Sequence, residues 1–242
     1  MNQEEKLFSL EGSQKRDMPL HHLQLKEIFQ LIKNNTKPIF YSSHRSRNNF
    51  KKNLFNPDEL FQRAKKVLKE NKKNFLEIGF GDGRSVIDMA RDKSEINFFC
   101  IEAYSKGFTN LFEKIKREKL ENIILLYGDA IEIIDRLFED ASIDKIFIFF
   151  PDPWPKAKHK KRRILNKYSI NLFFKKLIQQ GIFHFTTDNI RYAYDVRSLL
   201  SSHFPTKNNI IFSDNRGDRP ITKYEKKALL KKNIIYDLIV SN

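Results

Sequence analysis

The chain of 242 residues has little of several residue types that define common classes of protein. Its single cysteine, Cys100, excludes an internal disulfide and a cysteine-based zinc cluster. No apolar run is long enough to span a bilayer. Glu4 and Glu5 stand where a secretory signal peptide carries cationic residues. We therefore expect a cytoplasmic protein with no membrane partner and no bound metal.

Acidic residues are also scarce relative to basic ones. The chain has 45 Lys and Arg against 30 Asp and Glu, a formal net charge of +15 and a pI near 9.7. Such a balance indicates an acidic partner, most simply nucleic acid. The alternative is codon drift in an AT-rich genome, which would enrich Lys, Asn, Ile and Phe together. Local clustering of the charges has to separate the two.

From residue 73 onward, short apolar runs alternate with segments of helical periodicity. Strands are expected at 75–78, 96–101, 123–127, 146–150 and 182–185, and helices at 84–91, 107–119, 130–138, 168–180 and 190–201. This regular alternation predicts an α/β domain with a doubly wound, mainly parallel sheet covered on both faces. The tail at 233–240 has no helix after it and is expected to add an edge or antiparallel strand.

The first 55 residues differ from the rest and are expected to form an N-terminal extension. It would contain a short amphipathic helix at 21–33 and a basic loop at 44–52. Asn56-Pro57-Asp58-Glu59 is a typical helix start, so the main domain is expected to cover 56–242, opening with a helix to about residue 70. Neither part predicts whether the protein is a monomer or a homodimer.

Three glycines, Gly79, Gly81 and Gly83, follow the first predicted strand at alternate positions. Glycines permit a tight turn and a close approach of a ligand to the backbone. Their spacing is G-x-G-x-G rather than the G-x-G-x-x-G that lays a pyrophosphate on a helix N-terminus. Because no Lys-Ser or Lys-Thr follows the loop, a P-loop is excluded.

Carboxylates stand at the ends of four predicted strands: Glu77, Glu102, Asp129 and Asp152. They would repel a phosphate-bearing cofactor and favour a cationic one, which indicates S-adenosylmethionine. Glu102 is placed to accept both ribose hydroxyls, as the acid of dinucleotide folds does. Asp129 would accept the adenine amine, while the N–H of Ala130 faces a ring nitrogen.

The fourth of these acids lies in the most unusual stretch of the chain. Asp152 stands between Pro151 and Pro153, which stiffen the backbone, and the only tryptophan, Trp154, follows. A dense basic cluster comes next: Lys156, Lys158, Lys160, Lys161, Arg162 and Arg163. The cluster predicts contact with phosphates, against the alternative of a solvated charge run. Trp154 would either stack on a base or pack in the core.

Four segments together carry a family resemblance: Leu76-Glu77-Ile78-Gly79-Phe80-Gly81, Pro151-Asp152-Pro153-Trp154-Pro155-Lys156 with the basic residues after it, Thr187-Asp188, and Arg219-Pro220-Ile221-Thr222-Lys223-Tyr224-Glu225. They resemble the bacterial tRNA (guanine-N7-)-methyltransferases. The resemblance implies methyl transfer from S-adenosylmethionine to N7 of a guanine in the tRNA variable loop. It also implies the Rossmann-like, seven-stranded, mainly parallel sheet of class I methyltransferases, with an N-terminal helical extension.

The resemblance assigns expected roles to individual residues. Asp152 resembles the active-site residue, and the four strand-end acids resemble the cofactor contacts. The expected substrate contacts are Lys156, Asp188, Thr222, Lys223, Tyr224 and Glu225, with the remaining basic cluster and His159 serving as phosphate or structural residues. Two alternatives stay open: an exocyclic-amine methyltransferase, whose Asp-Pro-Pro-Tyr turn is loosely similar, and a non-catalytic RNA-binding relative.

Overall fold

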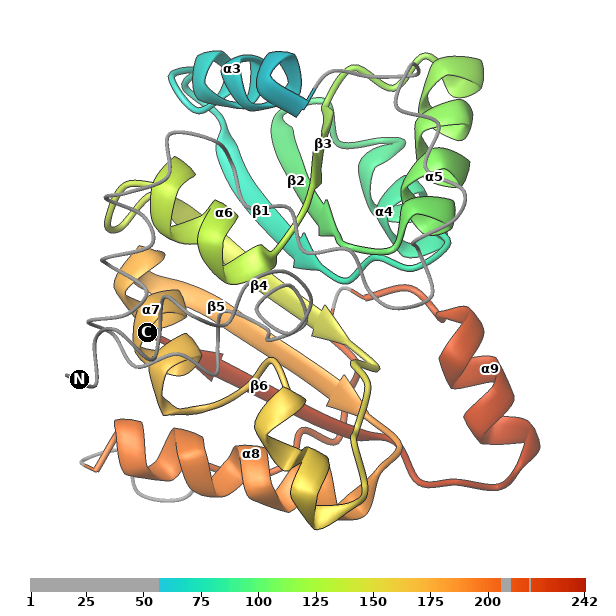
Figure 1. Cartoon of the computed structure of the whole chain (residues 1–242), viewed down its shortest axis with the longest axis vertical. Coiled ribbons are helices and arrows are strands. Elements are labelled where there is room, and N and C mark those ends of the chain that lie inside the picture. The colour runs from blue at the N-terminus through green and yellow to red at the C-terminus, as the bar shows by residue number, and fades with distance from the viewer. Residues whose placement is uncertain (1–56, 206–209, 218) are drawn as a thin grey trace, which may run out of the picture.

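The computed structural model describes residues 57–205, 210–217 and 219–242 (Figure 1). The predicted extension at 1–55, with its helix at 21–33 and its basic loop at 44–52, lies outside the described residues. No helix within the described ranges is long and apolar enough to cross a membrane.

The described residues alternate between strands and helices, as the sequence predicts. The strands are β1 (Lys73–Ile78), β2 (Ile96–Glu102), β3 (Ile123–Tyr127), β4 (Ile143–Phe149), β5 (Leu177–Thr187) and β6 (Tyr236–Ser241). The helices are α3 (Pro57–Val67), α4 (Arg84–Ala90), α5 (Ser105–Glu118), α6 (Ala130–Leu137), α7 (Lys167–Lys176), α8 (Ile190–His203), α9 (Lys223–Leu230) and the 3-10 helix η2 (Ala157–Arg162).

The strands form one sheet in the order β3-β2-β1-β4-β5-β6. β1 to β5 are mutually parallel, and β6 runs antiparallel to β5. The chain winds from β1 toward one edge and then returns to the other side of β1 at β4. The topological switch point therefore lies between β1 and β4, and in such sheets ligands bind beyond the carboxyl ends of the strands there.

The predicted doubly wound fold is confirmed, but the expected count of seven strands is wrong for the described residues. The described sheet has six strands. On the outer side of β6, the described residues add an isolated antiparallel bridge between Ser213 and Asp237, with the Ser213 N–H bonded to the Asp237 carbonyl at 2.8 Å.

Alternate residues of each strand point to opposite faces of the sheet, and each face has its own core. Leu76 and Ile78 of β1 join the cluster formed with α3, α6, α7 and α8, while Phe75 joins the cluster formed with α4 and α5. The central strands β1, β2 and β4 are buried over most of their length on both faces, which explains why they read as continuous apolar runs rather than as alternating patterns.

One predicted boundary is wrong. The helix expected at 168–180 ends at Lys176, and Leu177 already begins β5. Leu177 pairs with Ile143 of β4 across a register irregularity, and Gln180 takes a left-handed φ of 66°. Pairing with β4 therefore overrides the helical preference of this stretch. The helices η2 and α9 were not predicted, because they are short and carry little apolar periodicity.

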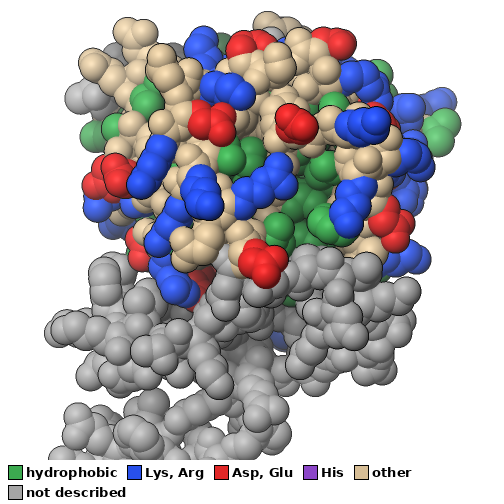
Figure 2. Space-filling model, turned by 90° about the horizontal axis from the view of Figure 1, so that it is seen from above, with side chains coloured by type: hydrophobic (Ala, Val, Ile, Leu, Met, Phe, Trp, Pro, Cys, Tyr) green, Lys and Arg blue, Asp and Glu red, His purple; other side chains and the backbone are tan. Residues whose placement is uncertain are grey.

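The basic charge is not uniform over the surface. Figure 2 shows a face, seen from above Figure 1, where Lys and Arg side chains are intermingled with acidic ones. Individual ion pairs join Arg91 to Glu118 at 2.9 Å and Arg136 to Glu132 at 3.0 Å. Exposed pairs of this kind contribute little stability.

The core on both faces of the sheet predicts the effect of truncating a buried side chain of a central strand. Leu76 is 0% exposed and Leu230 is 85% exposed. We expect Leu76→Ala to lower the free energy of unfolding by about 2–5 kcal/mol, since it removes buried methyl groups and leaves a cavity. Leu230→Ala, the matched control, should change it by less than about 0.5 kcal/mol. Urea unfolding measures both, and equal effects would contradict the assignment of the core.

Candidate functional site

The glycine loop after β1 needs glycine at each of its three predicted positions. Gly79, Gly81 and Gly83 have φ values of 75°, 60° and 72°, a region that other residues rarely adopt. A Cβ on Gly83 would also lie 2.6 Å from a side-chain carbon of Leu111. The loop is thus tightly specified, as expected from its spacing.

A fourth glycine, Gly107, packs closely against the loop and was not singled out in the sequence. A Cβ on Gly107 in α5 would lie 2.3 Å from the carbonyl oxygen of Gly81. Gly107 therefore lets α5 approach the loop closely. The available signal was a glycine at the start of a predicted helix, a position that often has a packing reason.

Glu102, at the end of β2, fixes the glycine loop through its carboxylate. Oε2 accepts the N–H of Gly81 at 2.9 Å, and Oε1 accepts the N–H groups of Ala103 and Tyr104, each at 2.9 Å. Loss of hydration raises the pKa of Glu102, although these backbone hydrogen bonds oppose the rise. A carboxylate has about four acceptor sites, and three of those of Glu102 are occupied, so one remains on Oε2 for one of the two predicted ribose hydroxyls.

Glu77, near the end of β1, is buried with one oxygen unsatisfied. Its side chain accepts a hydrogen bond from Ser85 Oγ at Oε1, at 2.8 Å, while the buried Oε2 has no partner among the described residues. Burial, with a smaller contribution from the nearby acids Glu102 and Asp82, raises the pKa of Glu77 to about 7. A cationic ligand group would satisfy this oxygen, so the site fits the ammonium or sulfonium of S-adenosylmethionine.

Asp129 ends the loop after β3 and caps α6. Its Oδ1 accepts the N–H groups of Ile131 and Glu132 at 2.9 and 3.2 Å. Burial raises the pKa of Asp129 against these bonds. Ala130 is the first residue of α6, where a backbone N–H has no intrahelical acceptor. The predicted roles of Asp129 and Ala130 toward adenine are therefore compatible with the local geometry.

Asp152 is exposed on the turn that follows β4, beside the topological switch point between β1 and β4. The turn starts where the Phe150 N–H bonds to the Thr186 carbonyl at 2.8 Å. The negative charge of Asp152 contributes to the raised pKa of Glu102, which shows that the two carboxylates influence the same region. The structure thus brings Asp152 to the carboxyl ends of the parallel strands, where Glu77 and Glu102 also lie.

The basic cluster forms η2 directly after this turn. Five of its six cations have exposed side chains: Lys156, Lys158, Lys160, Lys161 and Arg162. Trp154 lies within the cluster rather than in either hydrophobic core, with the Arg162 guanidinium 4.9 Å from the indole centroid and the His159 ring edge-on at 5.7 Å. Core packing of Trp154 is therefore excluded within the described part of the chain.

Arg163, the sixth cation, differs from the others because its side chain is only 5% exposed. Its NH1 donates to Asp195 Oδ2 at 2.6 Å, and its Nε donates to the Pro153 carbonyl at 2.7 Å. The expected RNA contact of Arg163 is thus not supported by its position. Asp195 and Tyr192, which hold it from α8, were not singled out in the sequence.

The C-terminal motif lies beside the glycine loop. A side-chain carbon of Tyr224 would be 3.7 Å from a Cβ on Gly81, which places the start of α9 against the loop. Thr222 caps α9 by accepting the Glu225 N–H at 3.1 Å, and the buried Glu225 carboxylate pairs with Arg216 at 2.6 Å and with Arg219. Of the expected substrate contacts here, Lys223 and Tyr224 are exposed, whereas Glu225 is committed to ion pairs.

Arg219 connects this motif to the sheet. It donates through Nε and NH2 to the two oxygens of Asp237 on β6, both at 2.7 Å. Asp237 also accepts from Thr186 at 2.6 Å and lies 2.7 Å from His184 Nε2, and these partners hold its pKa well below the usual range despite its burial. Asp188, another expected substrate contact, accepts from Asn233 at 2.9 Å.

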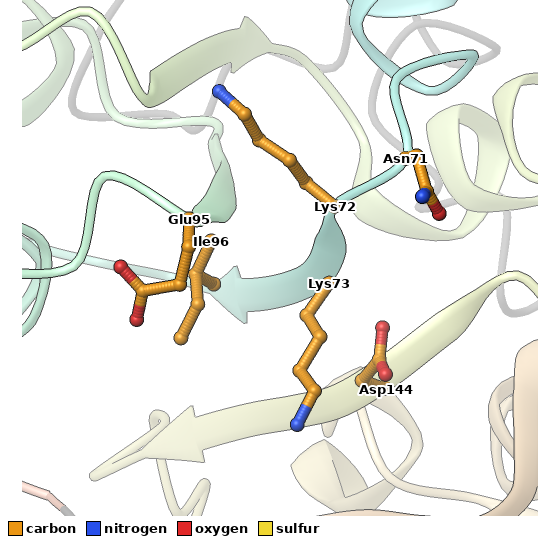
Figure 3. A pocket seen from close by; sticks show the side chains of 6 residues that line it. All are labelled: Asn71, Lys72, Lys73, Glu95, Ile96 and Asp144. Carbon is orange, nitrogen blue, oxygen red and sulfur yellow. The ribbon is translucent and has the colours of Figure 1, made fainter.

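A pocket at the amino ends of the parallel strands is separate from this site. Figure 3 shows its lining residues, Asn71, Lys72, Lys73, Glu95, Ile96 and Asp144. They stand at or before the amino ends of β1, β2 and β4, opposite the strand ends that carry the acids. The described residues also contain no group of three or more His, Cys, Asp or Glu side chains that could hold a metal.

Comparisons with known proteins identify related methyltransferases. A family model described as "Putative methyltransferase" matches residues 71–238. A tRNA (guanine-N(7)-)-methyltransferase of Nitrosococcus oceani is 37% identical over 172 residues, which cover 71% of this chain and 72% of that protein. One of Corynebacterium glutamicum is 35% identical over 189 residues, covering 75% and 73%.

A solved structure described as an antibiotic-related methyltransferase shares the fold, with a TM-score of 0.55 at 15% identity, covering 78% of this chain and 95% of that one. Together with the site geometry, the extent and identity of the matches to curated relatives are decisive for family membership. The chain belongs to the tRNA (guanine-N7-)-methyltransferase family.

Proposed function

We propose that this protein transfers the methyl group of S-adenosylmethionine to N7 of a guanine in tRNA, at a position in the variable loop. The observation that carries the proposal is the gathering of Glu77, Glu102, Asp129 and Asp152 at one sheet edge, with the basic helix η2 attached to the last of them. The relatives described above carry the name of this activity.

The described residues offer complementary contacts for each part of the cofactor. Glu77 has a buried, unpartnered oxygen for a cationic group of the methionine end. Glu102 has one acceptor position left for a ribose hydroxyl, and Asp129 with Ala130 offers an acceptor and a donor to adenine. When bound, S-adenosylmethionine supplies an electrophilic methyl group on a sulfonium.

The acceptor nitrogen needs no general base, because guanine N7 has an in-plane lone pair and carries no proton at neutral pH. Catalysis then depends on holding N7 in line with the methyl carbon, that is, on positioning. In our proposal Asp152 accepts hydrogen bonds from the guanine N1–H and N2 amine. Its negative charge also stays favourable as positive charge moves onto the purine.

The direct test is incubation of the protein with unmodified tRNA and methyl-labelled S-adenosylmethionine, followed by nucleoside analysis. We expect labelled 7-methylguanosine that maps to the variable loop. Asp152→Ala should lower turnover by at least about 100-fold, as loss of a preorganised electrostatic group does. The matched control Asp92→Ala changes an exposed acid before β2, at the opposite edge, and should retain activity.

The outcomes of this test separate the alternatives. A methyl group on an exocyclic amine would contradict N7 chemistry and favour the related amino-methyltransferases. Absence of both methylation and calorimetric binding of S-adenosylmethionine would favour a non-catalytic RNA-binding role. Wild-type turnover by Asp152→Ala would remove Asp152 from the active site.

The raised pKa of Glu77 predicts a pH dependence of cofactor binding. Below about pH 7 the free protein holds a proton on Glu77, and a cationic ligand must displace that proton. The affinity for S-adenosylmethionine should therefore fall by up to about tenfold per unit as the pH drops below 7. Calorimetry between pH 5.5 and 7.5 measures this.

Glu77→Gln, which removes the titrating group, should bind more weakly and lose this slope. Glu95→Gln, which changes an exposed acid at the amino ends of the strands, should keep the pH dependence of binding.

The same pKa shift should make the cofactor-free wild-type protein less stable as the pH rises from about 4.5 to 7, because the unfolded chain releases the Glu77 proton at a lower pH than the folded protein does. If the stability of Glu77→Gln still fell over this pH range, another titrating group would be responsible for the fall.

The exposed cations of η2 predict a steep salt dependence of tRNA binding. Each phosphate contact contributes a log–log slope of about −0.7 to −0.9. The double variant Lys158→Gln/Lys161→Gln should reduce the steepness by about 1.4–1.8. Lys66→Gln/Lys69→Gln, which changes exposed lysines in and after α3, is the matched control and should leave the slope unchanged. Filter binding measures both, and an unaltered slope in the η2 variant would exclude η2 from the RNA interface.

A further inference from the structure

We propose that Arg163 is a positioning residue that fixes the turn carrying Asp152, rather than a phosphate contact like its neighbours in the basic cluster. The inference rests on the proposed function for the role of Asp152. It is carried by three separate contacts of one buried guanidinium and by two strained residues in the turn that it holds.

The first support is the geometry of the guanidinium. Nε donates at 2.7 Å to the carbonyl of Pro153, the residue next to Asp152, and NH1 donates at 2.6 Å to Asp195. The guanidinium carbon also lies 4.4 Å from the ring centroid of Tyr192. A cation that is 5% exposed and engaged on three sides is not available to a phosphate.

The second support is the backbone of the turn. Phe150 and Trp154 have φ values of 50° and 41°, which bulky residues rarely adopt. Such conformations are energetically costly and persist only where the surroundings impose them. The Pro153 carbonyl lies between these two residues, and Pro153 has no N–H to offer. The bond from Arg163 therefore acts on the strained part of the turn.

The third support is where the clamp is anchored. Tyr192 and Asp195 belong to α8, and the Tyr192 ring packs edge-on against Phe185 of β5 at 5.3 Å. Arg163 thus links the turn after β4 to a helix that is fixed on the neighbouring strand. This link fixes the position of Asp152 relative to the carboxyl ends of the strands.

Only an arginine can make this set of contacts. The planar guanidinium donates in two directions while its face stacks on an aromatic ring, whereas a lysine ammonium is a compact point charge. Arg163→Lys therefore keeps the charge and removes the clamp. A phosphate contact would largely survive this exchange, and a positioning contact would not.

The experiment compares Arg163→Lys with Arg191→Lys, an exposed arginine of α8 that receives the same substitution. We expect Arg163→Lys to lower kcat by about 100-fold, as a misplacement of about 1 Å can do. The Kd for tRNA and its salt dependence should stay within about twofold, since the charge is retained. Arg191→Lys should match the wild type in all three measurements.

A second readout does not depend on activity. Trp154 is the only tryptophan of the chain, so its fluorescence reports on this turn alone. We expect Arg163→Lys to increase acrylamide quenching of Trp154, and Arg191→Lys to leave it unchanged. If the wild type failed to methylate tRNA, the proposed function would be wrong, while increased quenching would still support the clamp.

Unchanged kcat together with unchanged quenching in a folded Arg163→Lys would overturn the proposal. So would a variant whose only defect is weaker tRNA binding with a shallower salt slope. If Arg163→Lys lost its circular-dichroism signature of folding, Asp195→Ala would decide, because it leaves Arg163 in place and removes the carboxylate that accepts from it. That variant should show the same two changes at smaller size, and wild-type behaviour would contradict the clamp.

Discussion

The structure depends on the convergence of parallel strand ends at the switch point between β1 and β4. This arrangement places Glu77, Glu102 and Asp152 at the carboxyl ends of the strands, where loss of hydration and nearby like charges disfavour the ionisation of Glu77 and Glu102. The protein partly compensates Glu102 with three backbone N–H groups but leaves one oxygen of buried Glu77 without a described partner. That uncompensated acceptor makes the edge receptive to a cationic ligand.

Two buried arginines give the loops around this edge their rigidity. Arg163 ties the turn after β4 to α8, and Arg219 ties the start of α9 to Asp237 of β6. Both guanidiniums meet carboxylates at short distance, and a buried cation is tolerated only when it is paired and hydrogen-bonded in this way. The basic residues therefore differ in their surroundings: the lysines of η2 are exposed, whereas Arg163 and Arg219 are buried and ion-paired.

Much of the fold and the outline of the site could be predicted from the sequence. The glycines at 79, 81 and 83 occupy left-handed conformations because the loop requires them, and Glu102 follows the next parallel strand, so both lie at the same edge. The end of the helix expected at 168–180 could not be predicted, because Leu177 is drawn into β5 by pairing with Ile143 of β4. The count of seven strands came from the family resemblance, and among the described residues a single bridge at Ser213 lies on the outer side of β6.

The sequence by itself determined which stretches form strands and helices and which acids stand at strand ends, since both properties depend on short-range patterns of residues. The tertiary structure alone decided what each member of the basic cluster does. Arg162 and Arg163 are adjacent and chemically identical, yet one lies exposed over Trp154 and the other is buried between Tyr192, Asp195 and the Pro153 carbonyl. Their difference depends on where α8 packs, more than 25 residues along the chain, and no local pattern encodes that contact.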